Sequence, residues 1–95
     1  MQSPCPWLAE INLSFNQIGP ARTESLAGVL GQCTALVKLD LHYNDIRTSG
    51  SVSLAGVLPQ CPTLSYLDLS SNQIGASAAA RLRAVWSAEP IHLVL

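Results

Sequence analysis

The stretch Leu36-Val-Lys-Leu-Asp-Leu-His-Tyr-Asn-Asp-Ile46 decides the fold of this chain. Apolar and polar residues alternate through it with period two, which is the pattern of a half-buried β-strand. We expect its leucines to point into a core and its Lys, Asp and His to lie on an exposed face. The strand should end at Asn44, where the chain turns, and Ile46 should return to the core.

The same pattern returns every 28 residues along the chain. The cysteines, leucines, asparagines and isoleucines keep one register, for example Cys5, Cys33 and Cys61; Asn16, Asn44 and Asn72; Ile18, Ile46 and Ile74. A fixed period of about 20 to 50 residues marks a solenoid, in which each unit buries its apolar face against its neighbours. The sequence therefore predicts one domain with units 5–32, 33–60 and 61–88 and a partial fourth strand at 91–95.

Each unit continues from the turn into an amphipathic helix. In the middle unit we expect Gly50 to supply a positive φ before the helix, and Pro59 and Pro62 to limit its length. The apolar residues that follow Gly50 have helical spacing. They are Val52, Leu54, Ala55, Val57 and Leu58. The predicted class is α/β, built from a strand–turn–helix unit used three times.

The repeated asparagine has a specific physical use. A side-chain amide carries both donors and acceptors, so it can bind backbone groups of its own turn and of the next turn. Stacked units should therefore form a ladder of amides across the solenoid.

Composition excludes several classes of protein. Hydrophobic residues make up 48% of the chain and charged residues 12%, which is too apolar for disorder. The net charge of −1 is spread singly, so a nucleic-acid-binding stripe is not expected. No apolar run approaches the roughly 18 residues that span a bilayer, and the start lacks the features of a secretory signal. We therefore expect a cytoplasmic protein.

The three cysteines lack the short paired spacing that zinc sites need. Their equivalent positions in the repeat favour reduced, buried thiols over a disulfide framework. Trp7 and Trp86 stand at the first and last units, where they could shield the ends of the core.

The pattern Leu-x-x-Leu-x-Leu-x-x-Asn-x-Ile, followed by Leu-Ala-Gly-Val-Leu, resembles the ribonuclease-inhibitor class of leucine-rich repeats. The resemblance covers roughly residues 5–86 and implies a right-handed horseshoe with a parallel sheet on its concave side. It also implies a role in protein–protein binding, and the units are similar to the C-terminal repeats of NOD-like receptors. Two departures stand out. Arg22 and Ala78 replace Gly50 in the other units, and the chain is short for the family.

The two ends suggest a piece of a longer array. Leu95 falls at the 28-residue spacing from Leu67, inside what looks like a fourth strand. Uncapped ends of this kind expose strand edges and apolar core, so we expect either self-association through them or marginal folding.

A protein partner is expected on the concave face, where outward strand residues differ between units over a constant core. Exposed aromatic residues suit such contacts, although Phe15 and Tyr43 could instead cover the Asn turn. The expected contact residues are Glu10, Asn12, Ser14, Phe15, Lys38, Asp40, His42, Tyr43, Tyr66, Asp68 and Ser70.

Asp40 and Asp68 hold equivalent positions on neighbouring strands and should lie close together. Paired carboxylates can do acid–base work or bind a cation, and His42 could complete such a cluster. Ordinary exposed charges near Lys38 explain the same pattern, and this interpretation is favoured. No catalytic, cofactor-binding or metal-binding residue is assigned.

Two alternatives to a binding module remain open. Ran GTPase-activating proteins use similar repeats to stimulate GTP hydrolysis, but this idea rests on fold analogy alone. The chain could also be a truncated fragment without a function of its own.

Overall fold

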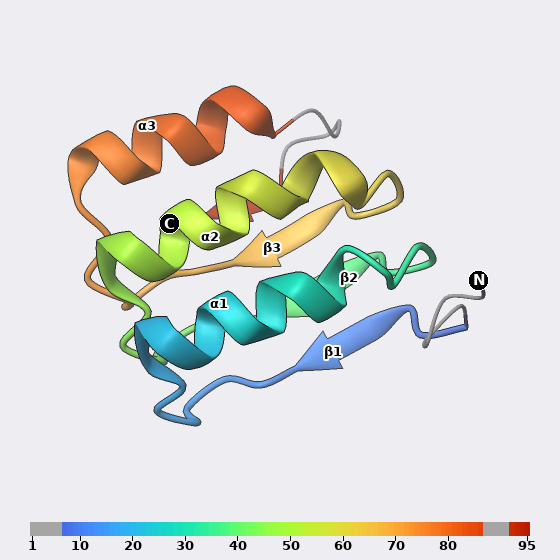
Figure 1. Cartoon of the computed structure of the whole chain (residues 1–95), viewed down its shortest axis with the longest axis horizontal. Coiled ribbons are helices and arrows are strands. Elements are labelled where there is room, and N and C mark those ends of the chain that lie inside the picture. Colours follow the sequence, from blue (N-terminus) through green and yellow to red (C-terminus); the bar gives the residue numbers. More distant parts are fainter. Residues whose placement is uncertain (1–6, 87–91) are drawn as a thin grey trace.

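Strands and helices alternate along the chain, and every strand joins one parallel sheet. The computed structural model describes residues 7–86 and 92–95. The sheet order is β1-β2-β3-β4, and the helices lie side by side on one face of the sheet (Figure 1). The elements are β1 (Glu10–Asn12), α1 (Gly19–Leu30), β2 (Lys38–Asp40), α2 (Arg47–Val57), a 3₁₀ turn η1 (Leu58–Gln60), β3 (Tyr66–Asp68), α3 (Ala76–Val85) and β4 (His92–Val94). This arrangement confirms the predicted α/β solenoid.

The 28-residue period sets the register of the first three strands. Leu39 pairs with Ile11 on one side and with Leu67 on the other. In the fourth strand, however, Leu93 pairs with Leu67, so the prediction that Leu95 would do so is wrong. A shift of two residues keeps the same side chains on the buried face, and alternation alone could not distinguish the two registers.

The core lies between the sheet and the helices. The inward leucines of the middle unit are almost completely buried, as predicted, and so is Ile46. Leu54 of α2 and Leu82 of α3 close the core from the helical layer, with no exposed surface. Complete burial of such a side chain contributes about 1.5–3 kcal/mol, so this layer is the main source of stability.

Helix α2 begins earlier than predicted, and Gly50 lies inside it. The positive φ falls on Arg47 (63°), which takes the place that Gly19 (73°) has in the first unit. Gly50 is needed for a different reason: a Cβ there would lie 3.3 Å from both Pro20 Cα and Thr23 Cβ of α1. It therefore allows the two helices to approach closely.

One predicted member of the apolar helix face is misplaced. Val52 is 40% exposed, whereas Leu54, Ala55, Val57 and Leu58 are buried. Two residues of an α-helix span about 200°, so Val52 points away from the face that carries Leu54. The helix ends at Val57, and η1 carries Pro59, in keeping with the expected limit on its length.

The cysteines do not share one state. Cys61 is a free, buried thiol, and its burial raises its pKa. Cys33 is disulfide-bonded, so the prediction of a reduced thiol is wrong for this residue. Equivalent positions in a repeat determine how a cysteine packs, but they do not determine whether its thiol is oxidised. Cys5 lies outside the described residues.

The two tryptophans also differ. Trp86 packs against the core at the end of α3, as expected of a residue that shields an open end. Trp7 is 76% exposed, so it does not act as a shield at the other end.

The described part of the chain contains no helix with the length and apolar character that crossing a membrane requires.

Candidate functional site

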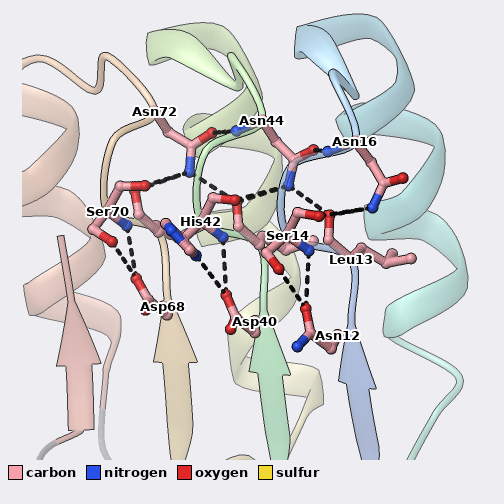
Figure 2. A network of polar contacts seen from close by, with 12 residues as sticks. Asn12, Leu13, Ser14, Asn16, Asp40, His42, Asn44, Asp68, Ser70 and Asn72 are labelled. Atoms are coloured by element: carbon pink, nitrogen blue, oxygen red, sulfur yellow. Dashed lines mark hydrogen bonds and ion pairs between the residues drawn. The ribbon is translucent and has the colours of Figure 1, made fainter.

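The predicted asparagine ladder is present. Asn44 lies at its centre: its Oδ1 accepts from the backbone N–H of Asn16 at 2.8 Å, and its Nδ2 donates to the carbonyl of Leu13 at 2.8 Å. Asn72 makes the equivalent bonds to the backbone of Asn44 and Leu41, at 2.8 and 2.9 Å (Figure 2). The ladder therefore joins the turns of successive units.

The turns adopt an unusual backbone to receive these amides. Residues with positive φ alternate with the others, and the N–H groups of Asn44 and Ile46, two residues apart, both donate to Asn72 Oδ1 at 2.8 and 3.2 Å. This conformation costs a non-glycine residue about 1–2 kcal/mol, so the ladder must hold it in place. The non-glycine residues with positive φ are Phe15, Gln17, Tyr43, Asp45, Arg47, Ser71 and Gln73.

This backbone places two aromatic side chains at the end of the strands. Phe15 and Tyr43 stack with their ring centroids 5.0 Å apart and their planes 26° apart. They are 63% and 58% exposed, so most of each side chain is open to solvent and available for contact. We call this pair the aromatic rim.

Polar side chains cover the sheet face opposite the helices, which we call the strand face. The parallel register brings like positions into two rows. The first row is Glu10, Lys38, Tyr66 and His92, and the second is Asn12, Asp40, Asp68 and Val94. His92 and Val94 were not among the predicted contact residues, because residues 91–95 were expected to form only a partial strand.

Aromatic and basic groups meet within the first row. The Lys38 ammonium lies 4.9 Å from the centroid of the Tyr66 ring, in cation–π geometry. Tyr66 is followed by His92, with 6.2 Å between ring centroids. A depression of about 230 Å³ lies over the paired strands β1 and β2 beside Lys38. This row offers both apolar and charged contact area.

The second row has a local structural role that the sequence analysis missed. Asp68 Oδ1 accepts from the backbone N–H of Ser70 at 2.9 Å and from its hydroxyl at 2.6 Å. Asn12 makes the same two bonds with Ser14, and Asp40 accepts from the N–H of His42. The signal was an Asn or Asp two residues before the turn in every unit, which is a common turn-capping pattern.

Asp40, His42 and Asp68 converge, as the sequence suggested they could. One ligand atom from each lies within 4.8 Å of the other two. His42 also meets the aromatic rim, because its ring packs edge-on against Phe15 with 4.6 Å between centroids. The cluster thus links the second row to the rim.

A second depression lies beyond the rim and was not predicted. It has a volume of about 540 Å³ and contains an ion pair between Arg47 and Asp45, whose Nε and Oδ1 atoms are 2.9 Å apart. The carboxylate of Asp45 raises the pKa of the Arg47 guanidinium, first through the hydrogen bond and then through its charge. Its lining residues are Gln17, Tyr43, Asn44, Asp45, Arg47, Ser71 and Gln73.

The predicted contact residues differ in accessibility. Glu10, Asn12, Phe15, Lys38 and Tyr43 are exposed, whereas Ser14, Asp40, His42, Tyr66, Asp68 and Ser70 are half-buried. The structure thus brings them together as one polar face with an aromatic edge.

Comparison with known proteins gives one positive result. A family model described as Leucine Rich repeat matches residues 5–21, 32–55 and 60–82, which is more than half of the chain. Neither the curated proteins nor the solved structures contain a match to this chain.

Proposed function

Because the chain belongs to the leucine-rich repeat family, of the ribonuclease-inhibitor type, we propose that it is a protein-interaction module whose partner binds the strand face and the aromatic rim. Repeats of this family are in general protein-interaction modules. The proposal adds the location of the site to that general role.

The exposed Phe15–Tyr43 stack is the observation that carries this proposal. An aromatic side chain buries about 150–250 Å² when it is covered, and few rotatable bonds are lost in doing so. Both residues have a left-handed backbone, which keeps their rings projecting from the turn. A rigid, exposed aromatic pair beside a polar face offers the kind of side chain that commonly contributes most to binding, with polar contacts next to it.

Two alternative assignments remain proposals without residue-level support. Similarity to the repeats of NOD-like receptors rests on the amino-acid sequence of the units, above all Leu-Ala-Gly-Val-Leu. A GTPase-activating role rests on analogy of fold, and an assay of GTP hydrolysis with the small GTPase would test it.

Site-specific photo-cross-linking tests the location of the site. A photoreactive phenylalanine analogue replaces Tyr43 or Tyr66 and, as controls, Val29 or Val52, two exposed apolar residues of the helices. We expect one and the same protein to be cross-linked from both tyrosine positions and from neither valine position.

Affinity measurements with that purified protein complete the test. The double variant Tyr43→Ala/Tyr66→Ala should bind at least about 10-fold more weakly, since aromatic hot spots commonly contribute 2 kcal/mol or more. The control variant Val29→Ala should bind within about two-fold of the wild type. Cross-linking through the helices, or unchanged affinity of the tyrosine variant, would place the site elsewhere.

A further inference from the structure

The convergence of Asp40, His42 and Asp68 has a chemical use beyond protein contact. Strands β2 and β3 place the two carboxylates directly opposite each other. Within the described part of the chain, no lysine or arginine forms an ion pair with either carboxylate, and the ammonium of Lys38 lies over Tyr66 instead. Among the described residues, His42 is the side chain that lies within ion-pair distance of this carboxylate pair, 3.5 Å from Asp40.

Both carboxylates are already oriented. Asp68 holds its turn through Oδ1, with bonds of 2.9 and 2.6 Å from Ser70, and Asp40 holds its turn through Oδ1, with a bond of 3.1 Å from His42 N. In the described contacts, Oδ2 of each carboxylate makes no hydrogen bond. One oxygen of each group is thus free for another ligand, while the other fixes its direction.

His42 supplies a nitrogen aimed at the same point. Its Nδ1 is shielded from solvent and has no hydrogen-bond partner among the described residues. It lies 3.5 Å from Asp40 Oδ1 without forming a hydrogen bond to it. The Phe15 ring packs edge-on against the imidazole and restrains its position. A buried nitrogen without a partner normally requires an explanation, and a missing ligand is one.

We propose that Asp40, His42 and Asp68 form a binding site for a divalent transition-metal ion of the Zn²⁺ type. A tetrahedral Zn²⁺ ion with bonds of about 2.0–2.1 Å holds its ligand atoms about 3.3–3.4 Å apart. The Asp40–His42 pair is already at 3.5 Å, measured to Asp40 Oδ1, which keeps a second lone pair beside its bond from His42 N, and one ligand atom from each of the three residues lies within 4.8 Å of the other two. Binding of the ion would draw the three ligand atoms together by at most about 1.5 Å between any two of them.

The donor set distinguishes this ion from the commoner cations. Ca²⁺ and Mg²⁺ prefer oxygen ligands alone, whereas an imidazole nitrogen favours Zn²⁺ and its neighbours in the transition series. Three protein ligands would leave the fourth coordination position of the ion to water or to a side chain from a partner. The ion is expected to bind the isolated chain, so this inference does not depend on the proposed protein partner.

Calorimetric titration of the full 95-residue chain with ZnCl₂ tests the site. We expect saturable binding of one ion per chain, unaffected by millimolar Mg²⁺. The variants Asp68→Asn and His42→Ala should each weaken binding at least 10-fold. The matched controls Asp45→Asn and His92→Ala remove an acid and a histidine outside the cluster and should leave the affinity unchanged.

Two further measurements exclude misleading results. Circular dichroism of each variant checks the fold, and Asp68→Asn should keep it because Asn12 forms the same turn in the first unit. Titration with Co²⁺ reports the ligands, since a bound thiolate would give a strong charge-transfer band that this site should lack. Absence of saturable binding, equal weakening in all four variants, or a Co²⁺–thiolate band would overturn the proposal and leave the carboxylates as turn caps only.

Discussion

Asn72 Oδ1 accepts a hydrogen bond from the backbone N–H of Asn44 at 2.8 Å, across the boundary between two units. Asn44 repeats this bond to Asn16 at the same distance. The amides thus add to the backbone bonds that join neighbouring turns, such as the bond from Gly19 N–H to the carbonyl of Asn44 at 2.9 Å. This relationship makes neighbouring turns depend on one another for stability.

Removal of the central amide should be costly. Asn44→Ala leaves several buried backbone groups of two turns without partners, at about 1–3 kcal/mol each, so we expect at least about 3 kcal/mol of destabilisation. Urea unfolding followed by circular dichroism measures it. The control is Asn16→Ala, because among the described residues the exposed Asn16 side chain bonds to nothing beyond the carbonyls of its own turn, Leu13 and Ser14. Equal losses in the two variants would contradict a ladder that couples units.

The turn cap at Asp68 should tolerate one substitution and not another. Asp68→Ala removes the acceptor of two hydrogen bonds from Ser70 and should lower the free energy of unfolding by about 1–2 kcal/mol. Asp68→Asn keeps an oxygen acceptor and should lie within about 0.5 kcal/mol of the wild type. Thermal unfolding of the three proteins side by side decides this. A large loss with Asn would show that the negative charge, not the cap, matters.

Two glycines of helix α2 should respond in opposite directions to alanine. In Gly50→Ala the new Cβ would meet Ile46 Cγ2 at 2.6 Å and α1 at 3.3 Å, so overpacking should cost about 1–3 kcal/mol. In Gly56→Ala the Cβ meets nothing within 4 Å, and the lower backbone entropy of the unfolded chain should make this change neutral or stabilising by up to about 1 kcal/mol. Chemical denaturation measures the free energy of unfolding of both variants and of the wild type. If both substitutions destabilised the protein, the close contact between α1 and α2 at Gly50 would not be the cause.

Stability should fall at alkaline pH through Cys61. Burial raises the pKa of this thiol in the folded state, so the unfolded chain loses its proton first as pH rises. The contribution is therefore complete below about pH 8.5, the usual pKa of a cysteine, and is lost as pH rises from there through the folded pKa. The free energy of unfolding of the wild type and of Cys61→Ala, measured between pH 7 and 10, isolates the contribution of this thiol. The difference between the two should shrink with pH, and a constant difference would refute the assignment.

Much of the strand face could be predicted because alternation is a local property. Each strand residue faces the core or solvent according to its position in a period of two, and the burial of Leu36, Leu39 and Leu41 follows. The exposed rim at Phe15 and Tyr43 was harder. The two rings could either project into solvent or fold over the Asn turn. The backbone conformation of the turn decides between these arrangements, and the presence of aromatic residues does not reveal it.

The sequence by itself determined the repeat unit, the inward leucines and the asparagine ladder, because these depend on spacing within one unit or between identical positions of adjacent units. Only the tertiary structure decided the register of β4, the role of Gly50 between two helices, and the exposure of the Phe15–Tyr43 pair. Each of these depends on distances between chain segments, and residues that satisfy the same alternation or helical period can satisfy more than one such packing.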